Sequence, residues 1–346
     1  MGEYARSLAI AQAARRHWPR AEIQFVLSRQ APYAATVPFP ATVLDSSPTF
    51  HSRAVAKLIG EFKPHVVIFD NAGRTAQLRA ARRAGARIVF ISARSRQRRK
   101  AFRWRWMRLL DEHWIAYPEF IAGSFGWLER FKLKQLGRPT VRYLDVILST
   151  PPEHDSMLGR VGLKHGSYVL VVPGGGTGHP GVDDAVGKFL AAANSLVETQ
   201  TVVFVGPTAA ADSGAAAQRP SGKGLEVNPR LRCFNSLPQA DLADLMSGAR
   251  VIMANGGSTL LQAIACGGAC IAIPIAQDQA MRVQRCVEAG VALRAELDAA
   301  SMVRVARKLL GDESARASLA RRASELKLAN GIKVALNALS HLIKTA

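Results

Sequence analysis

Two glycine-rich turns in the second half of the sequence carry residue types that bind phosphate groups. The first turn contains Gly174, Gly175, Gly176, Thr177 and His179, directly after the apolar run 168–172. Glycines at a strand-to-helix turn let backbone N–H groups approach phosphate oxygens, and the helix N-terminus adds positive potential. This turn lacks the Lys-Ser/Thr pair of a Walker loop and the spaced glycines of a dinucleotide-binding fingerprint. A tight turn that needs positive φ explains the glycines equally well, so the motif alone is a weak signal.

The second turn is more specific, because further polar residues follow it in order. Asn255-Gly256-Gly257-Ser258-Thr259 ends the apolar run that begins at 250, Gln262 follows one helical turn later, and Asp278-Gln279 comes after the next apolar run. Ser258 or Thr259 can cap a helix that starts there, which aligns backbone donors and a hydroxyl beside an anion. As plain structure these are a capped helix and a polar loop. Their order favours a ligand site at the carboxyl edge of a sheet.

This block resembles the C-terminal domain of nucleotide-sugar glycosyltransferases of the two-Rossmann-domain (GT-B) type. It is most similar to the family of the lipid-intermediate N-acetylglucosaminyltransferase of peptidoglycan synthesis (glycosyltransferase family 28), over about 168–297. The resemblance implies three donor contacts: the diphosphate at Gly256, Gly257, Ser258 and Thr259, the ribose at Gln262, and the sugar at Asp278 and Gln279. Two positions depart from the family pattern, since Gln262 replaces an acidic residue and Asn255 replaces a histidine. A neutral Gln262 bonds a hydroxyl without charge assistance. We also place His179 near the donor.

Two carboxylates are candidates for a general base in the first half of the chain. Glu3 stands where the same family has a histidine in a glycine-rich turn before Arg-Ser-Leu, and a carboxylate can accept a proton from an acceptor hydroxyl. Its alternative role is to favour a helix N-terminus electrostatically. Asp70 ends the apolar run 65–70, where a helix cap is the alternative.

The basic segment 94–108 holds eight Lys and Arg and no acidic residue, interleaved with aromatic side chains. On a helix from about Gln97, Phe102, Trp106 and Leu109 share one stripe with cations beside it. Such a helix favours an anionic bilayer surface, and a basic helix whose aromatics pack inward is the alternative. Nucleic acid is the weaker partner, because no RNA- or DNA-binding motif accompanies the segment. The predicted membrane contacts are Arg98, Arg99, Arg103, Trp104, Arg105 and Trp106.

Apolar strands alternate with amphipathic helices in both halves, which predicts an α/β protein with two doubly wound Rossmann-like domains facing across a cleft. We predict an acceptor domain over 1–150 and a donor domain over 151–346, whose final helices can cross back to the first domain. The strand that should precede the first helix is absent. It would be central, so its loss should leave its neighbours unpaired, and we hypothesise a native start some ten residues upstream.

Length and composition agree with this organisation. The chain has 346 residues, 48% of them hydrophobic, which suits two domains. No apolar run is long enough to span a bilayer and no signal peptide is recognisable. The four cysteines lack paired spacing, which favours buried reduced thiols over metal ligands. Residues 1–150 hold 26 Lys and Arg against 10 Asp and Glu, whereas 151–346 hold 20 against 16. This asymmetry predicts an acidic partner for the first domain.

The sequence therefore predicts an inverting glycosyltransferase that moves a sugar from a nucleoside-diphosphate donor, by preference UDP, to a lipid-linked or cell-envelope glycan acceptor. No Asp-x-Asp metal motif occurs, so we expect no metal or other cofactor, and helix N-termini and backbone donors would stabilise the leaving group. We expect a cytoplasmic protein on the inner face of the cytoplasmic membrane. A nucleotide-sugar hydrolase or epimerase of the same fold is the alternative, and so is a non-catalytic binding paralogue.

Overall fold

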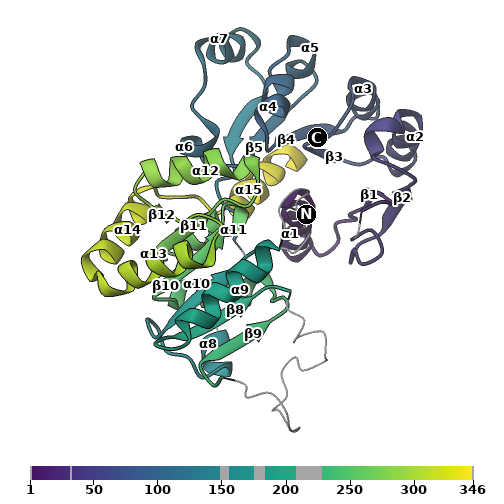
Figure 1. Ribbon diagram of the computed structural model, residues 1–346. Helices are drawn as coiled ribbons and strands as arrows, with labels where there is room; N and C mark the ends of the chain where they lie inside the picture. Colours follow the sequence, from purple (N-terminus) through teal and green to yellow (C-terminus); the bar gives the residue numbers. More distant parts are fainter. Residues whose placement is uncertain (1, 32, 149–155, 175–183, 208–227, 345–346) are drawn as a thin grey trace. The chain divides into compact units, whose positions relative to one another are not determined.

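The computed structural model describes residues 2–31, 33–148, 156–174, 184–207 and 228–344 (Figure 1). The chain forms two compact units, and we describe each by itself. Unit 1 comprises Met1–Ile147 together with Ala329–Ala346, and unit 2 comprises Leu148–Leu328. The last helix thus belongs to unit 1. The predicted second domain, 151–346, includes this helix, but the prediction also provides for final helices that cross back to the first domain.

Unit 1 contains two parallel sheets and the helices that cover them. Its strands are β1 (Phe25–Ser28), β2 (Ala41–Leu44), β3 (Val66–Asp70), β4 (Arg87–Ser92), β5 (Glu112–Ile115) and β6 (Thr140–Tyr143). Its helices are α1 (Gly2–His17), η1 (a 3₁₀ turn, Pro48–Phe50), α2 (Ser52–Phe62), α3 (Thr75–Arg83), α4 (Ser95–Ala101), α5 (Trp104–Met107), α6 (Glu119–Ala122), α7 (Trp127–Leu136) and α15 (Gly331–Lys344).

The strands of unit 1 divide into the pair β1-β2 and the four-stranded sheet β3-β4-β5-β6. In the described part of the chain, β1 and β3 are therefore both terminal strands of their sheets. The proposed upstream start itself stays a prediction.

Helices cover both faces of the four-stranded sheet. Successive side chains of a strand point to opposite faces, so alternate residues of β4 pack against different helices. Ile88 and Phe90 of β4 pack with Leu78 of α3 and Trp106 of α5. Val89 and Ile91 of β4 instead pack with Ile10 of α1 and with Ala335, Ala338 and Leu339 of α15. The near-continuous apolar sequence of β4, RIVFIS, follows from this burial on both sides.

Unit 2 is a parallel sheet of six strands. Its strands are β7 (Tyr168–Val172), β8 (Thr201–Val205), β9 (Leu231–Phe234), β10 (Val251–Asn255), β11 (Cys270–Ile273) and β12 (Ala292–Arg294). Its helices are α8 (Met157–Arg160), α9 (Ala185–Leu196), α10 (Gln239–Gly248), α11 (Ser258–Ala265), α12 (Gln277–Glu288), α13 (Ala299–Gly311) and α14 (Glu313–Glu325).

The strand order of unit 2 is β12-β11-β10-β7-β8-β9. The chain runs outward from β7 to β9, then returns to the other side of β7 and runs outward from β10 to β12. The order therefore reverses between β7 and β10, and ligands of open α/β sheets bind at the carboxyl ends of strands at such a switch point. The core that fixes these two strands includes Val169 and Val171 of β7 and Val251 and Met253 of β10.

The structure also bears on the predicted state of the cysteines and on the prediction that no segment spans a membrane. All four cysteines are free thiols; Cys270 and Cys286 are buried and Cys266 is half-buried, as expected, but Cys233 on the outer strand β9 is exposed. That strand lies at the edge of its sheet, where one face stays open to water. No helix in the described part of the chain is long and apolar enough to cross a membrane.

Candidate functional site

The two glycine turns predicted from the sequence meet at the switch point of unit 2. Gly174 follows β7, and Gly256 and Gly257 follow β10, its hydrogen-bonded neighbour. Asn255 joins the two turns: its Nδ2 donates to the Pro173 carbonyl at 2.8 Å, and its Oδ1 accepts from the backbone N–H of Gly257 at 3.0 Å. Asn255 is buried, so this amide holds Pro173, at the start of the first turn, against the second turn rather than facing solvent.

Glycine is required at both turns for steric reasons. Gly174 has φ of +96°, and a Cβ there would lie 2.0 Å from Nδ2 of Asn255. A Cβ on Gly256 would lie 2.6 Å from Cγ2 of Val283 and 3.0 Å from Cβ of Gln279. The side chains of Asn255, Val283 and Gln279 therefore pack directly against the glycine backbone, and no larger residue fits at these points.

Helix α11 starts directly after this turn, but the predicted hydroxyl cap is wrong. Gly257 is the N-cap residue and no side chain caps the helix, so Ser258 and Thr259 occupy its first two positions. N–H groups in the first turn of a helix have no partner within the helix. Ser258 is exposed, so this start of α11 offers backbone donors at the edge of the sheet where the two turns meet.

The structure separates the remaining predicted donor residues. Gln279 lies beside Gly256, with its Oε1 accepting from the backbone N–H of Ile275 at 3.0 Å. The side-chain amide of Gln262 is engaged within the unit, because its Nε2 donates to Gln239 of α10 at 2.9 Å. Asp278 is the second residue of α12. Gly175, Gly176, Thr177 and His179 lie outside the described residues.

Sequence reasoning missed Arg282, which is buried on α12 and donates to the carbonyl of Gly256. It brings a positive charge to the back of the glycine turn, four residues after Asp278 on the same helix. A cation on the buried side of an amphipathic helix is the sequence signal that could have revealed it.

In unit 1, the candidate base Asp70 is held in a buried ion pair. Its carboxylate accepts from both Nε and Nη2 of Arg6, the Nε contact at 3.2 Å, and from the hydroxyl of Ser7 at 2.7 Å. Burial raises the pKa of the Asp70 carboxyl, while Arg6 and Ser7 act against that rise by stabilising the charged form. This arrangement ties the start of α1 to the end of β3, so positioning is the main role the structure gives Asp70.

Glu3 lies close to the same strand end. Its Oε1 accepts from Nδ2 of Asn71, the residue after β3, which also accepts from the backbone N–H of Ala93 at 3.1 Å. Tyr4 stacks on Tyr33 with 3.9 Å between ring centroids, and burial together with Glu3 raises the pKa of Tyr33. The structure thus brings both predicted carboxylates to the carboxyl end of β3, with Glu3 the one not engaged by a cation in the described residues.

The predicted membrane helix is wrong in part. The segment breaks at Phe102 and Arg103 between the short helices α4 and α5. Trp106 is fully buried in the core, where its ring packs against the ring of Phe90. Its Nε1 donates to the hydroxyl of Thr75 at 3.0 Å. Arg98 is also buried and forms an ion pair with Glu129 of α7 at 2.7 Å.

Neither Trp106 nor Arg98 can therefore meet a bilayer in this fold. Arg99, Arg103, Trp104 and Arg105 are exposed, so peripheral membrane attachment through them stays a prediction.

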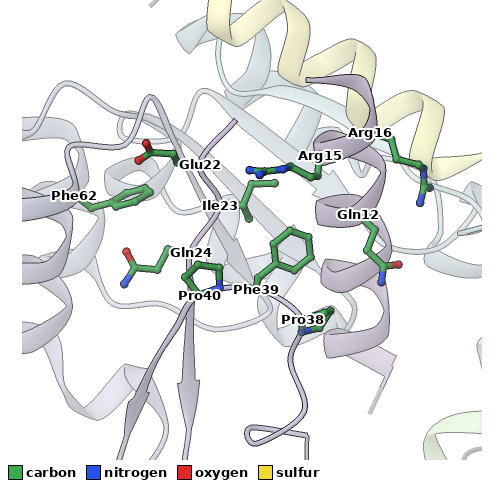
Figure 2. Close-up of a pocket in the computed structure, with 10 residues that line it drawn as sticks. All are labelled: Gln12, Arg15, Arg16, Glu22, Ile23, Gln24, Pro38, Phe39, Pro40 and Phe62. Atoms are coloured by element: carbon green, nitrogen blue, oxygen red, sulfur yellow. The ribbon is translucent and has the colours of Figure 1, made fainter. Parts of the chain in front are cut away.

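A cavity of about 630 Å³ lies against the other end of α1 (Figure 2). Figure 2 shows Gln12, Arg15 and Arg16 of α1 beside Glu22, Ile23 and Gln24, the residues before β1. Glu3 and Arg6 belong to the first two turns of α1, so this cavity is separate from the candidate base.

Comparisons with known proteins agree on the fold. No protein-family model matches the sequence, and a comparison with curated protein sequences found no match. Among solved structures, a spinosyn forosaminyltransferase has a TM-score of 0.64 at 14% identity, covering 97% of this chain and 95% of that one. A UDP-glucosyltransferase from Polygonum tinctorium has 0.62 at 15%, covering 97% and 95%. A putative UDP-N-acetylglucosamine 2-epimerase from Listeria monocytogenes has 0.55 at 13%, covering 94% and 96%.

At these identities the likeness concerns the fold alone. The two parallel-sheet units of the chain have the GT-B fold of two Rossmann-like domains, which confirms the predicted fold class. The transferases and the epimerase share this fold, so it does not distinguish between those reactions.

Proposed function

We propose that the protein is an inverting, metal-independent glycosyltransferase that uses a nucleoside-diphosphate sugar, by preference a UDP-sugar, and a lipid-linked or cell-envelope glycan acceptor. The observation that carries the proposal is the meeting of Gly174, the Asn255-Gly256-Gly257 turn and the start of α11 at the switch point of unit 2. Backbone donors there suit a diphosphate, whose departure they would stabilise as charge develops on it.

The acceptor side of the proposed reaction belongs to unit 1. Glu3 would accept the proton of an acceptor hydroxyl while that oxygen attacks the anomeric carbon and the diphosphate leaves from the opposite face. One such displacement inverts the configuration of that carbon. Within the described residues, no three His, Cys, Asp or Glu side chains gather into a metal site, and metal independence stays a prediction.

Removal of a single backbone donor tests the donor site. A Ser258→Pro variant lacks the N–H at the first helical position, which proline otherwise occupies readily, and Gly257 before it is extended as a residue preceding proline should be. We expect calorimetry to show UDP binding weakened about tenfold or more, because a hydrogen bond to a charged group is lost. Ser258→Ala separates the effect of the hydroxyl.

A matched control places proline at the start of another helix of unit 2. Ala299 is the first residue of α13, after an extended Asp298, and Ala299→Pro should leave UDP binding unchanged. Failure of the wild-type protein to bind UDP, GDP or dTDP would contradict the proposal, and would favour a binding paralogue with another ligand.

A nucleotide-sugar hydrolase or epimerase is the second candidate, supported by the similarity in fold to the Listeria epimerase. Incubation of the protein with UDP-sugars in the absence of any acceptor separates the two. Release of free sugar or formation of an epimer at full rate would favour the second candidate, whereas turnover that requires an acceptor supports transfer.

A further inference from the structure

A second cavity, of about 490 Å³, lies in unit 1 next to the candidate base. Its wall is formed by the segment from Asn71 to Thr75, by α4 and by the residues around the start of α5 (Figure 1). Five cations line it: Arg74, Arg96, Lys100, Arg103 and Arg105. No acidic side chain lines it, and none of the five forms an ion pair with a carboxylate in the described part of the chain.

Four of the five cations, the arginines, have exposed side chains, and the half-buried Lys100 lies among them. Lys100 is held in place by donating to the Gly73 carbonyl at 2.7 Å and by lying over the Trp106 ring, 4.4 Å from its centroid. Burial lowers the pKa of Lys100, and the charges of Arg74, Arg103, Arg96 and Arg105 lower it further. The fold therefore maintains mutual repulsion that a bound anion would relieve.

Polar groups of the cavity indicate what else the ligand carries. Ser47, Thr49 and Thr75 add hydroxyl groups to the wall. The Oε1 atom of Gln97, another lining residue, is buried and has no hydrogen-bond partner. A buried acceptor is costly without a donor, so rotation of this amide toward a hydroxyl or N–H group of a ligand would be favoured.

The cavity also adjoins the candidate catalytic carboxylate. Asn71 lines the cavity and donates from its Nδ2 to Glu3. A ligand in the cavity would therefore lie next to the residue proposed to accept the acceptor's proton.

We propose that this cavity binds the phosphate group of a phosphate ester that also carries hydroxyl groups, such as a glycosyl phosphate or diphosphate. That this ligand is the acceptor of the transfer rests on the proposed function, whereas binding of the phosphate does not. Arg side chains pair with phosphate oxygens through two N–H groups at once, which suits four arginines around one fixed lysine. The basic segment is then the wall of a binding site and not a surface helix for the bilayer.

Two double variants with the same charge change test the proposal. Arg103→Gln with Arg105→Gln removes two cations that line the cavity, while Arg99→Gln with Arg108→Gln removes two exposed cations of the same segment that do not line it. None of these four side chains has a hydrogen bond or ion pair in the described residues, so neither double variant should disturb folding.

Tryptophan fluorescence gives a reading confined to unit 1. All five tryptophans, Trp18, Trp104, Trp106, Trp114 and Trp127, belong to that unit. Trp106 contacts the cavity wall through Lys100 and Thr75. The Ser258→Pro background weakens the competing diphosphate site of unit 2, and the tryptophan signal reports on unit 1, so failure of the donor proposal and failure of this one are measured separately.

Titration with inorganic pyrophosphate is expected to change the fluorescence, with affinity reduced tenfold or more in the Arg103/Arg105 variant and less than twofold in the Arg99/Arg108 variant. An equal reduction in both variants, or no binding by the wild-type chain, would overturn the proposal. Vesicles of phosphatidylcholine and anionic phosphatidylglycerol, whose negative surface attracts basic segments, provide the other arm. Vesicle binding that depends on Arg103 and Arg105 without any pyrophosphate binding would assign the segment to a bilayer and overturn the proposal.

Gln97→Met tests the hydroxyl-bearing part of the ligand. The wild-type chain should bind glucose 1-phosphate more tightly than inorganic phosphate. The variant should bind the two with similar affinity, because its affinity for inorganic phosphate is retained and only the preference for the ester is lost. A preference that is unchanged by the substitution, or absent from the wild-type chain, would overturn the assignment of a hydroxyl-bearing ester.

Discussion

Arg6 and Asp70 stand 64 residues apart in the sequence and form a two-point ion pair at the carboxyl end of β3. Their side chains are only 8% and 12% exposed. The pair joins the first helix to the strand end beside Glu3, so it determines where the candidate base lies.

Asp70→Asn should destabilise unit 1 strongly, because it leaves the buried charge of Arg6 without a partner. We expect a loss of about 3 to 5 kcal/mol in the free energy of unfolding, measured by urea denaturation with tryptophan fluorescence. The exposed pair of Arg29 and Asp45, with side chains 72% and 82% exposed, provides the control. Asp45→Asn should change stability by less than about 0.5 kcal/mol. Similar losses for the two variants would mean that the Arg6–Asp70 pair does not hold α1.

Glu3→Gln should reduce turnover without unfolding the protein. The amide oxygen of glutamine can still accept the hydrogen bond from Asn71, but it cannot take up a proton. We expect kcat to fall by about 10² to 10⁴, the usual contribution of a general base, once an acceptor has been identified. Glu22→Gln, next to the cavity of Figure 2, should retain full turnover. Full activity of the Glu3 variant would rule this residue out as the base.

Asn255→Asp should weaken donor binding while leaving the shape of the side chain unchanged. The variant loses the donor to the Pro173 carbonyl and adds a negative charge beside Gly257. We expect calorimetry to show an affinity for UDP lower by about tenfold or more, since both effects oppose a bound diphosphate. Asn194→Asp, with the same charge change on the exposed side of α9, is the matched control. Equal affinities for the two variants would place the diphosphate elsewhere.

His113 should make unit 1 less stable in acid. Burial, and to a smaller extent the charge of Arg98, lower its pKa to about 3. An unfolded histidine titrates near 6.5, so the unfolded chain takes up a proton that the folded chain refuses, and stability falls as the pH drops from about 6.5 toward 3. This contribution is about 2 kcal/mol at pH 5.

The measurement compares urea unfolding at pH 7.5 and pH 5 for the wild-type chain and for His113→Asn. The wild-type chain should lose about 2 kcal/mol more than the variant over this interval. His65 before β3 is exposed, so His65→Asn should keep the wild-type dependence. If all three proteins respond alike, the histidine is not excluded from water as the structure indicates.

The sequence by itself determined the alternation of strands and helices, the GT-B fold and the glycine turn after β10. Strands such as β4 can be recognised in the sequence as apolar runs, because burial of both faces leaves almost no position for a polar residue. Gly256 and Gly257 stand out in the sequence because a Cβ at either position would collide with a packed side chain, so only glycine fits. In each case the packing restricts which residue types are allowed at successive positions, so the pattern can be read from the sequence without knowing the partners.

Only the tertiary structure decided which side chains are free to act. Trp106 and Trp104 look alike in sequence, yet packing against Phe90 removes the first from the surface. The contacts of Gln262 with Gln239 of α10 and of Asp70 with Arg6 are likewise not evident from the sequence, while the predicted roles of Gln262 and Asp70 stay predictions. The basic segment becomes the wall of a cavity because β3, α3 and α4 meet there. Each of these outcomes depends on a partner distant in sequence, and periodicity within a segment carries no information about that partner.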